Sequence, residues 1–183
     1  MRAFIAVEIP GLILEGIADL IKEMRNYQTE GINYVRVENI HVTLKFLGEF
    51  DDNDTEAFCG DLSKIAWKSS RVETQSIGGF PDLKDPRVLW IGLKDNPGLN
   101  ALQASIEDVC RTYGIISEEK EFRPHLTIAR IKGKMNYRLA HFLENYPQDS
   151  FGGFLPKKFH LFQSKLSPAG PEYRIIRSFA QGG

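Results

Sequence analysis

Residues 40–44 read Ile-His-Val-Thr-Leu, and residues 124–128 read Pro-His-Leu-Thr-Ile. Alternation is the only period that five such residues support, so each stretch is predicted to be a β-strand. On a strand, His41 and Thr43 point to one face, and His125 and Thr127 share a face in the same way. The chain therefore makes an apolar-backed strand that carries an imidazole beside a hydroxyl, and makes it twice.

These two stretches end two copies of a longer pattern. A strand over residues 4–9, a Pro-Gly pair and a helical segment precede His41, whereas a strand over residues 89–93, a second Pro-Gly pair and a second helical segment precede His125. About thirty residues separate Pro-Gly from histidine in both copies. We therefore expect an α+β fold of two similar lobes related by a pseudo-two-fold axis, with the histidine strands facing each other across a cleft. No flexible linker divides the chain, so residues 1–183 are predicted to form one bilobal domain.

The other segments are predicted from hydrophobic periodicity and from turn and capping residues. Residues 78–81, Gly-Gly-Phe-Pro, are typical of a turn, and Asn96 followed by Pro97 predicts a helix start. A hairpin is expected across residues 167–171. The predicted helices cover 12–24, the segment after 52–53 that buries Phe58, Leu62 and Ile65, 97–113 and 137–146, and the predicted strands cover 3–9, 34–37, 40–49, 71–77, 87–93, 124–128, 157–166 and 173–179.

The composition is that of an ordinary globular protein. Hydrophobic residues make up 42% of the 183 residues and charged residues 26%, and the formal net charge of -1 excludes a surface coated in basic charge but not a local basic pocket. The N-terminal segment contains Glu8 and lacks a signal-peptide pattern, and no apolar run approaches the length of a membrane span. Cys59 and Cys110 have no metal-binding spacing and are predicted to be reduced, buried thiols of a cytoplasmic protein.

Two facing histidines suit a reaction that needs a base on one side of an atom and an acid on the other. Their ordinary pKa, near 6.5, lets one be neutral while the other is protonated. A phosphodiester is the natural target, because in-line attack on phosphorus needs a proton taken from water and a proton given to the leaving alkoxide on the opposite side. Thr43 and Thr127 would donate hydrogen bonds to the non-bridging oxygens.

Two cations beside the motifs are candidate phosphate contacts. Strict alternation places Lys45 on the face of the first histidine. It places Arg130 on the face opposite His125, so Arg130 reaches the phosphate only if the strand ends or bulges near Ala129. Alternation also puts Phe46 on the apolar face, where a core position is expected rather than a platform for stacked bases.

Residues 37–49, Val-Glu-Asn-Ile-His-Val-Thr-Leu-Lys-Phe-Leu-Gly-Glu, and residues 123–130, Arg-Pro-His-Leu-Thr-Ile-Ala-Arg, resemble the two signatures of the two-histidine phosphoesterase superfamily. Within that superfamily the chain is most similar to the prokaryotic RNA 2',3'-cyclic phosphodiesterases, once named 2'-5' RNA ligases. The likeness also extends over residues 2–6, 86–90 and 167–173.

The resemblance implies a bilobed fold with the site between two antiparallel sheets. It implies opening of a terminal 2',3'-cyclic phosphate on RNA to a 2'-phosphate, without a metal or other cofactor and with weak reverse ligation. His41 would give a proton to the leaving O3' and His125 would activate water, although the near-symmetric motifs do not themselves order these roles. Thr43 and Thr127 would hold the phosphate, with Arg130 as a further substrate contact. The expected partner is RNA with a cyclic-phosphate end, tRNA fragments included, and the expected state is a monomer without membrane attachment.

Three rival functions fit the sequence less well. A metal hydrolase needs three or four convergent ligands, but His141 and His160 lie outside any motif and are expected to be structural or solvated. An ATP-dependent ligase needs a nucleotidyl-lysine motif or a P-loop, and the sequence contains neither. The main alternative is a non-catalytic module that binds RNA ends in the same cleft.

Overall fold

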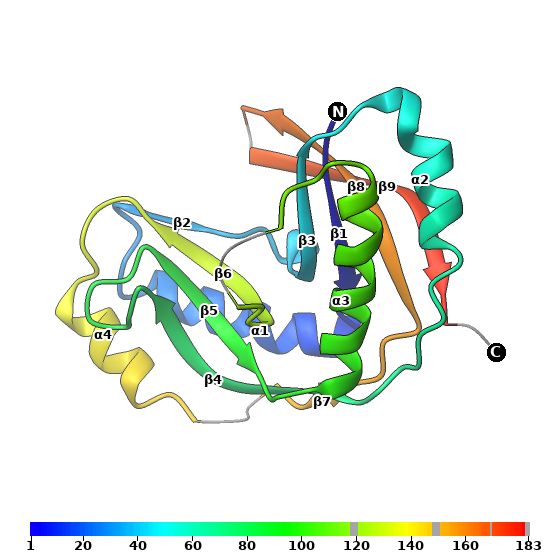
Figure 1. Ribbon diagram of the computed structural model, residues 1–183. Coiled ribbons are helices and arrows are strands. Elements are labelled where there is room, and N and C mark those ends of the chain that lie inside the picture. Colours follow the sequence, from blue (N-terminus) through cyan, green and yellow to red (C-terminus); the bar gives the residue numbers. More distant parts are fainter. Residues whose placement is uncertain (118–120, 148–150, 169, 182–183) are drawn as a thin grey trace.

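The computed structural model describes residues 1–117, 121–147, 151–168 and 170–181. Its strands form an antiparallel sheet in two halves, one with the order β3-β1-β8-β9 and the other with the order β7-β4-β5-β6, to which β2 adds along β6 (Figure 1). The halves meet where β3 pairs with β6 through Val42 and Leu126. The two expected sheets are thus joined at this one pair. The strands are β1 (Arg2–Glu8), β2 (Ile32–Tyr34), β3 (His41–Glu49), β4 (Val72–Phe80), β5 (Val88–Leu93), β6 (His125–Ile131), β7 (Gly153–Phe154), β8 (Lys158–Ser167) and β9 (Gly170–Ala180).

Two of the helices are exchanged between the halves. Helix α3, from the second copy of the pattern, contacts β3 of the first half, and Figure 1 shows it beside that strand. Helix α1, from the first copy, is followed by Tyr27, which stacks on Phe142 of α4 at a centroid distance of 4.8 Å in the second half. Asn96 caps α3 by accepting a hydrogen bond from the Leu99 amide, as its sequence predicts. The α-helices are α1 (Gly11–Arg25), α2 (Thr55–Leu62), α3 (Pro97–Thr112) and α4 (Tyr137–Glu144).

The predicted duplication is visible in the strand register. Strand β1 pairs antiparallel with β3, and β5 pairs antiparallel with β6 in the same way. Both pairings contain a β-bulge at the third residue after the histidine, at Leu44 in β3 and at Ile128 in β6. The pair between Val42 and Leu126 lies midway between the two motifs, where a pseudo-two-fold axis relating them has to pass.

Two predicted elements are wrong. The strand expected at residues 34–37 lies earlier in the chain, where β2 ends at Tyr34, and a 3-10 turn follows over Val37–Asn39. The turn expected at residues 78–81 is part of β4, which continues to Phe80. A Cβ on Gly78 would lie 2.2 Å from the Trp90 ring, so the glycine serves close packing against β5 rather than a turn.

Other boundaries differ by a few residues. Helix α2 ends at Leu62, so Ile65 lies beyond the helix, although Phe58 and Leu62 are buried as expected. The hairpin of β8 and β9 is confirmed, with residue 169 of its connection outside the described residues. Both cysteines are free and buried, as predicted. In the part of the chain that the structure describes, no helix is both long and apolar enough to span a bilayer.

Candidate active site

The structure brings the four motif residues together where the halves of the sheet join. His41 begins β3 and His125 begins β6. Because Val42 pairs with Leu126 in an antiparallel ladder, the register sets His41 across from Thr127 and sets Thr43 across from His125. Each imidazole therefore neighbours the hydroxyl of the other copy. The charge of His125 also lowers the pKa of His41, so the two rings are close enough to interact electrostatically.

Both imidazoles are held by the same backbone contact. The Nδ1 atom of His41 lies 2.7 Å from the carbonyl oxygen of Asn39, and Nδ1 of His125 lies 2.7 Å from that of Arg123. A carbonyl oxygen only accepts, so Nδ1 must carry the hydrogen in each ring. Nε2 is then the atom of each imidazole that can take or give a proton.

Both histidines are biased toward the neutral form. Burial lowers the pKa of His41 to about 4, against a smaller opposing effect of the Asn39 hydrogen bond. Its ring stacks on Phe4 at 4.8 Å, which removes water from one face. Burial also lowers the pKa of His125, and the charge of Arg130 lowers it further. The expectation of two ordinary pKa values is therefore wrong for the free protein, because aromatic side chains pack against both rings and shield them in part from water.

The two bulges decide which side chains join the histidines. In β6 the bulge at Ile128 buries both Ile128 and Ala129, so Arg130 is exposed and lines the same cavity as Thr127. This is the bulge that the sequence required if Arg130 was to reach the phosphate, and it is confirmed. In β3 the equivalent bulge puts Phe46, not Lys45, at the position that corresponds to Arg130.

The placement of Lys45 on the histidine face is therefore wrong. Lys45 is only 2% exposed, and its ammonium lies 2.8 Å from a carboxylate oxygen of Glu107 and donates to the carbonyl oxygen of Ile116 at 2.9 Å. Direct phosphate binding by Lys45 stays a prediction that this geometry does not favour. The core position expected for Phe46 is also wrong, because its side chain is 55% exposed.

The cleft consists of two adjoining cavities. One has a volume of about 990 Å³ and contains His125, whereas the other has a volume of about 900 Å³ and contains His41 and Thr127. Thr43 and Phe46 line both cavities and so mark their boundary.

Sequence reasoning missed several aromatic members of this site. Tyr173 of β9 meets the His41 ring edge-on at 5.4 Å, and Phe80 meets the His125 ring edge-on at 5.1 Å. Both residues are distant from the motifs in sequence. Only the fold brings them to the histidines, although Tyr173 lies in the stretch 167–173 over which the family likeness extends.

The other two histidines do not line the cleft cavities. His160 is buried on β8, where Nδ1 lies 2.8 Å from the Ser178 hydroxyl and Nε2 lies 3.2 Å from a Glu8 carboxylate oxygen. His141 is exposed on α4. Among the residues that the structure describes, no group of three or more His, Cys, Asp or Glu side chains is placed to hold a metal ion.

Comparison with known proteins identifies the class to which this fold and site belong. The family model of the LigT like phosphoesterases matches the chain twice, over residues 7–90 and 91–173, so the two matches follow the internal duplication. The chain belongs to this family and is a phosphoesterase, which confirms the resemblance found in its sequence.

Curated relatives span nearly the whole chain. An RNA 2',3'-cyclic phosphodiesterase of Archaeoglobus fulgidus is 34% identical over 179 residues, with 98% of this chain and 99% of the relative covered. A protein of the same name from Methanocaldococcus jannaschii is 36% identical over 181 residues, with 98% and 100% covered. Among solved structures, E. coli LigT complexed with 3'-AMP shares the fold with a TM-score of 0.84 at 23% identity, with 100% of this chain and 98% of LigT covered.

Proposed function

We propose that this enzyme opens a terminal 2',3'-cyclic phosphate on RNA to a 2'-phosphomonoester by two-histidine acid–base catalysis that needs no metal ion. The observation that carries the proposal is the matched pair of imidazoles, each fixed through Nδ1 to a backbone carbonyl at 2.7 Å. The names of the relatives that cover nearly the whole chain support the choice of substrate. Since each half supplies one imidazole, residues 1–183 would work as one bilobal unit.

The proposed reaction displaces O3' from phosphorus by a water oxygen. Nε2 of His125 takes the proton from water, and Nε2 of His41 gives its proton to O3' as the P–O3' bond breaks. The hydroxyls of Thr43 and Thr127 donate to the non-bridging oxygens, and Arg130 offsets the growing negative charge. In the reverse direction, O3' attacks the terminal 2'-phosphate and water leaves, which re-forms the cyclic ester. Weak 2'-5' ligation would follow if the 5'-hydroxyl of another RNA, in place of water, gives its proton to His125 and attacks the cyclic phosphorus while the P–O3' bond breaks and O3' takes a proton from His41.

The bound anion is part of this mechanism. An acid whose pKa lies at about 4 in the free protein holds its proton in only a small fraction of molecules at neutral pH. A cyclic phosphate carries one negative charge, and a negative charge beside an imidazole favours the imidazolium. Substrate binding would therefore raise the pKa of His41, so that its imidazole is protonated and can act as the acid.

The pH profile follows from these directions. In the free protein both pKa values lie below 6.5, and catalysis needs one protonated and one neutral imidazole. We expect kcat/KM to be bell-shaped with its maximum on the acid side of pH 6.5, and kcat to peak at a higher pH because the bound phosphate raises both pKa values. Initial rates on a cyclic-phosphate dinucleotide, measured from below pH 5 to above about pH 8, give the pH profiles of kcat/KM and of kcat. A kcat/KM profile that stays flat from roughly pH 5 to 8 contradicts the acid–base assignment.

The experiment that tests the function uses an RNA oligonucleotide with a 2',3'-cyclic phosphate end, incubated with the enzyme in EDTA. We expect turnover in EDTA, with phosphorus NMR showing the 2'-phosphate as product. Loss of turnover that Mg²⁺ or Mn²⁺ restores would contradict the metal-independent mechanism. Tight binding without turnover would instead support the RNA-end-binding module.

The setting of the reaction is also a proposal. We propose a cytoplasmic monomer that acts on RNA fragments with cyclic-phosphate ends, such as tRNA halves. The two free, buried cysteines are compatible with a reducing compartment. Light scattering after size exclusion would show a single species near 20.8 kDa, and a stable dimer would contradict the proposed monomer.

A further inference from the structure

The two cavities of the cleft differ sharply in charge. We call the cavity that contains His41 the basic arm, because four arginines and no aspartate or glutamate are among its lining residues. We call the cavity that contains His125 the mixed arm, because acidic side chains accompany its cations. The basic arm is lined by Arg2, Arg25, Arg36 and Arg130, and the mixed arm by Lys45, Arg87, Arg111 and Arg123 together with Glu107, Asp108 and Glu121.

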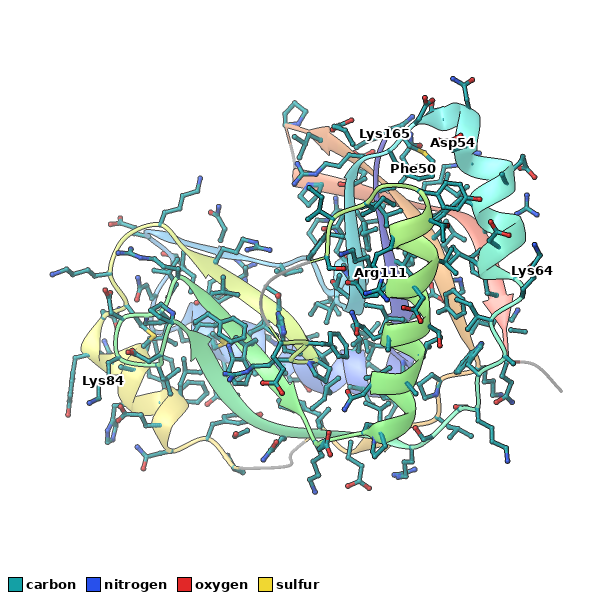
Figure 2. All side chains as sticks on the ribbon, viewed as in Figure 1. Phe50, Asp54, Lys64, Lys84, Arg111 and Lys165 are labelled. Atoms are coloured by element: carbon teal, nitrogen blue, oxygen red, sulfur yellow. The ribbon has the colours of Figure 1, made fainter. Side chains whose placement is uncertain are left out.

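In the mixed arm each cation already has a carboxylate partner. Lys45 pairs with Glu107 at 2.8 Å, and Arg111, which Figure 2 labels on α3, pairs with Asp108. The two remaining arginines have looser partners, with Arg87 at 3.9 Å from Asp85 and Arg123 at 3.9 Å from Glu121. The positive charge of this arm is therefore largely offset.

In the basic arm the charges are mostly unpaired. Within the described ranges, Arg2, Arg25 and Arg130 form no salt bridge with a carboxylate. The fourth arginine, Arg36, pairs with Glu38 at 2.7 Å. An unpaired guanidinium presents a planar set of donors that matches the oxygens of a phosphate. Three such groups in one cavity form a site for more than one anionic charge.

These arginines come from both halves of the sheet and lie around the cavity that contains His41. Arg130 pairs in register with Asn33 of the edge strand β2, and the guanidinium of Arg25 lies 4.6 Å from the ring of the adjacent Tyr34. Arg2 comes from β1 in the other half of the sheet. The charges of Arg130 and Arg2 both oppose the rise in the pKa of Tyr173 that burial causes, so both lie near that hydroxyl beside His41.

We propose that the RNA strand leading to the cyclic phosphate lies along the basic arm, where Arg2 and Arg25 bind phosphates of the nucleotides on its 5' side. The inference rests on the proposed function, because a cyclic phosphate at the 3' end leaves the rest of the strand only on the 5' side. Each nucleotide of a single strand adds one phosphate charge, and a basic groove binds such a backbone without reading its sequence. The arm therefore makes the enzyme select oligonucleotide ends over a cyclic mononucleotide.

The test compares two substrates with the same reacting end, a 2',3'-cyclic mononucleotide and a tetranucleotide that ends in it. The quantity measured is the ratio of kcat/KM for the tetranucleotide to kcat/KM for the mononucleotide. We expect this ratio to exceed one and to fall about tenfold in the double variant Arg2→Gln/Arg25→Gln, because two phosphate contacts are lost. The slope of log kcat/KM against log salt should become shallower by about 1.4 for the tetranucleotide, at about 0.7 for each phosphate contact that is lost.

The matched control removes two arginines from the mixed arm, in Arg87→Gln/Arg111→Gln. That variant should keep the wild-type ratio and the wild-type salt slope. A wild-type ratio near one overturns the inference, and so does a control variant that loses the preference while the basic-arm variant keeps it. If neither substrate is hydrolysed, the proposed function fails instead, and anisotropy of a labelled tetranucleotide bound at several salt concentrations still decides which pair of arginines holds the strand.

Discussion

Replacing His125 by asparagine should lower kcat by about 10²- to 10⁴-fold, and replacing His41 should lower it by a similar factor. Each substitution removes one proton-transfer group, Nε2, from one side of the phosphorus. Because the two groups act in the same step, the double variant should lose far less than the product of the single effects. Single-turnover rates on a cyclic-phosphate oligonucleotide measure these losses, and KM should change much less than kcat.

The control for this series is His141→Asn. His141 is exposed on α4 and lines neither cavity of the cleft, so its substitution should leave kcat unchanged. All three variants should keep the wild-type circular dichroism spectrum, because His41 and His125 are both only partly buried. If the His41 variant or the His125 variant retains wild-type kcat, or unfolds, the assignment of that imidazole to the cleft is contradicted.

Replacing Lys45 by methionine should reduce the free energy of unfolding by about 3 kcal/mol, because it leaves a largely buried carboxylate without its cation. The side chain of Glu107 is 15% exposed, and its remaining donors are Gln103 at 3.3 Å and Ser117 at 3.1 Å. Adding Glu107→Gln should recover more than half of the loss, since the unpaired charge is then gone. Urea unfolding of the two single variants and the double variant measures this coupling.

The matched control is an exposed lysine in an ion pair of similar length. Lys64 lies 2.7 Å from Asp61, and its side chain, labelled in Figure 2, is 77% exposed. Lys64→Met should change the free energy of unfolding by less than about 1 kcal/mol. If Lys45→Met were equally mild, the pair with Glu107 would not be holding α3 against β3.

The sequence predicted the structure best where the two-residue alternation of a strand also placed the functional side chains. Alternation over residues 40–44 and 124–128 gave both strands, both buried apolar faces and the shared face of each imidazole and hydroxyl. The repeated order of strand, Pro-Gly and helix gave the duplication that the strand register shows. Asn96 gave the start of α3, because a capping side chain acts within one turn of helix.

Several failures depend on contacts with segments that are distant in the sequence. Alternation put Lys45 on the histidine face and Phe46 in the core, but one extra residue at Leu44 buries Lys45 and exposes Phe46. The glycine pair at 78–79 is typical of a turn, but Gly78 lies in β4, where the ring of Trp90 on the adjacent strand leaves no room for a Cβ. The lowered pKa values of the histidines depend on Phe4, Phe80 and other aromatic rings that the fold brings from distant segments.

The central claim is that both imidazoles act on the same phosphorus. A crystal structure of the enzyme with an oligonucleotide that ends in a 2'-phosphate tests it most directly. We predict that Nε2 of His125 lies within about 2.6–3.2 Å of an oxygen of the 2'-phosphate, that Nε2 of His41 lies at a similar distance from the 3'-hydroxyl oxygen beside it, and that the hydroxyls of Thr43 and Thr127 contact other oxygens of the same phosphate. A complex in which only one of the two histidines reaches these atoms, or a phosphate bound outside the cleft between β3 and β6, would contradict the account.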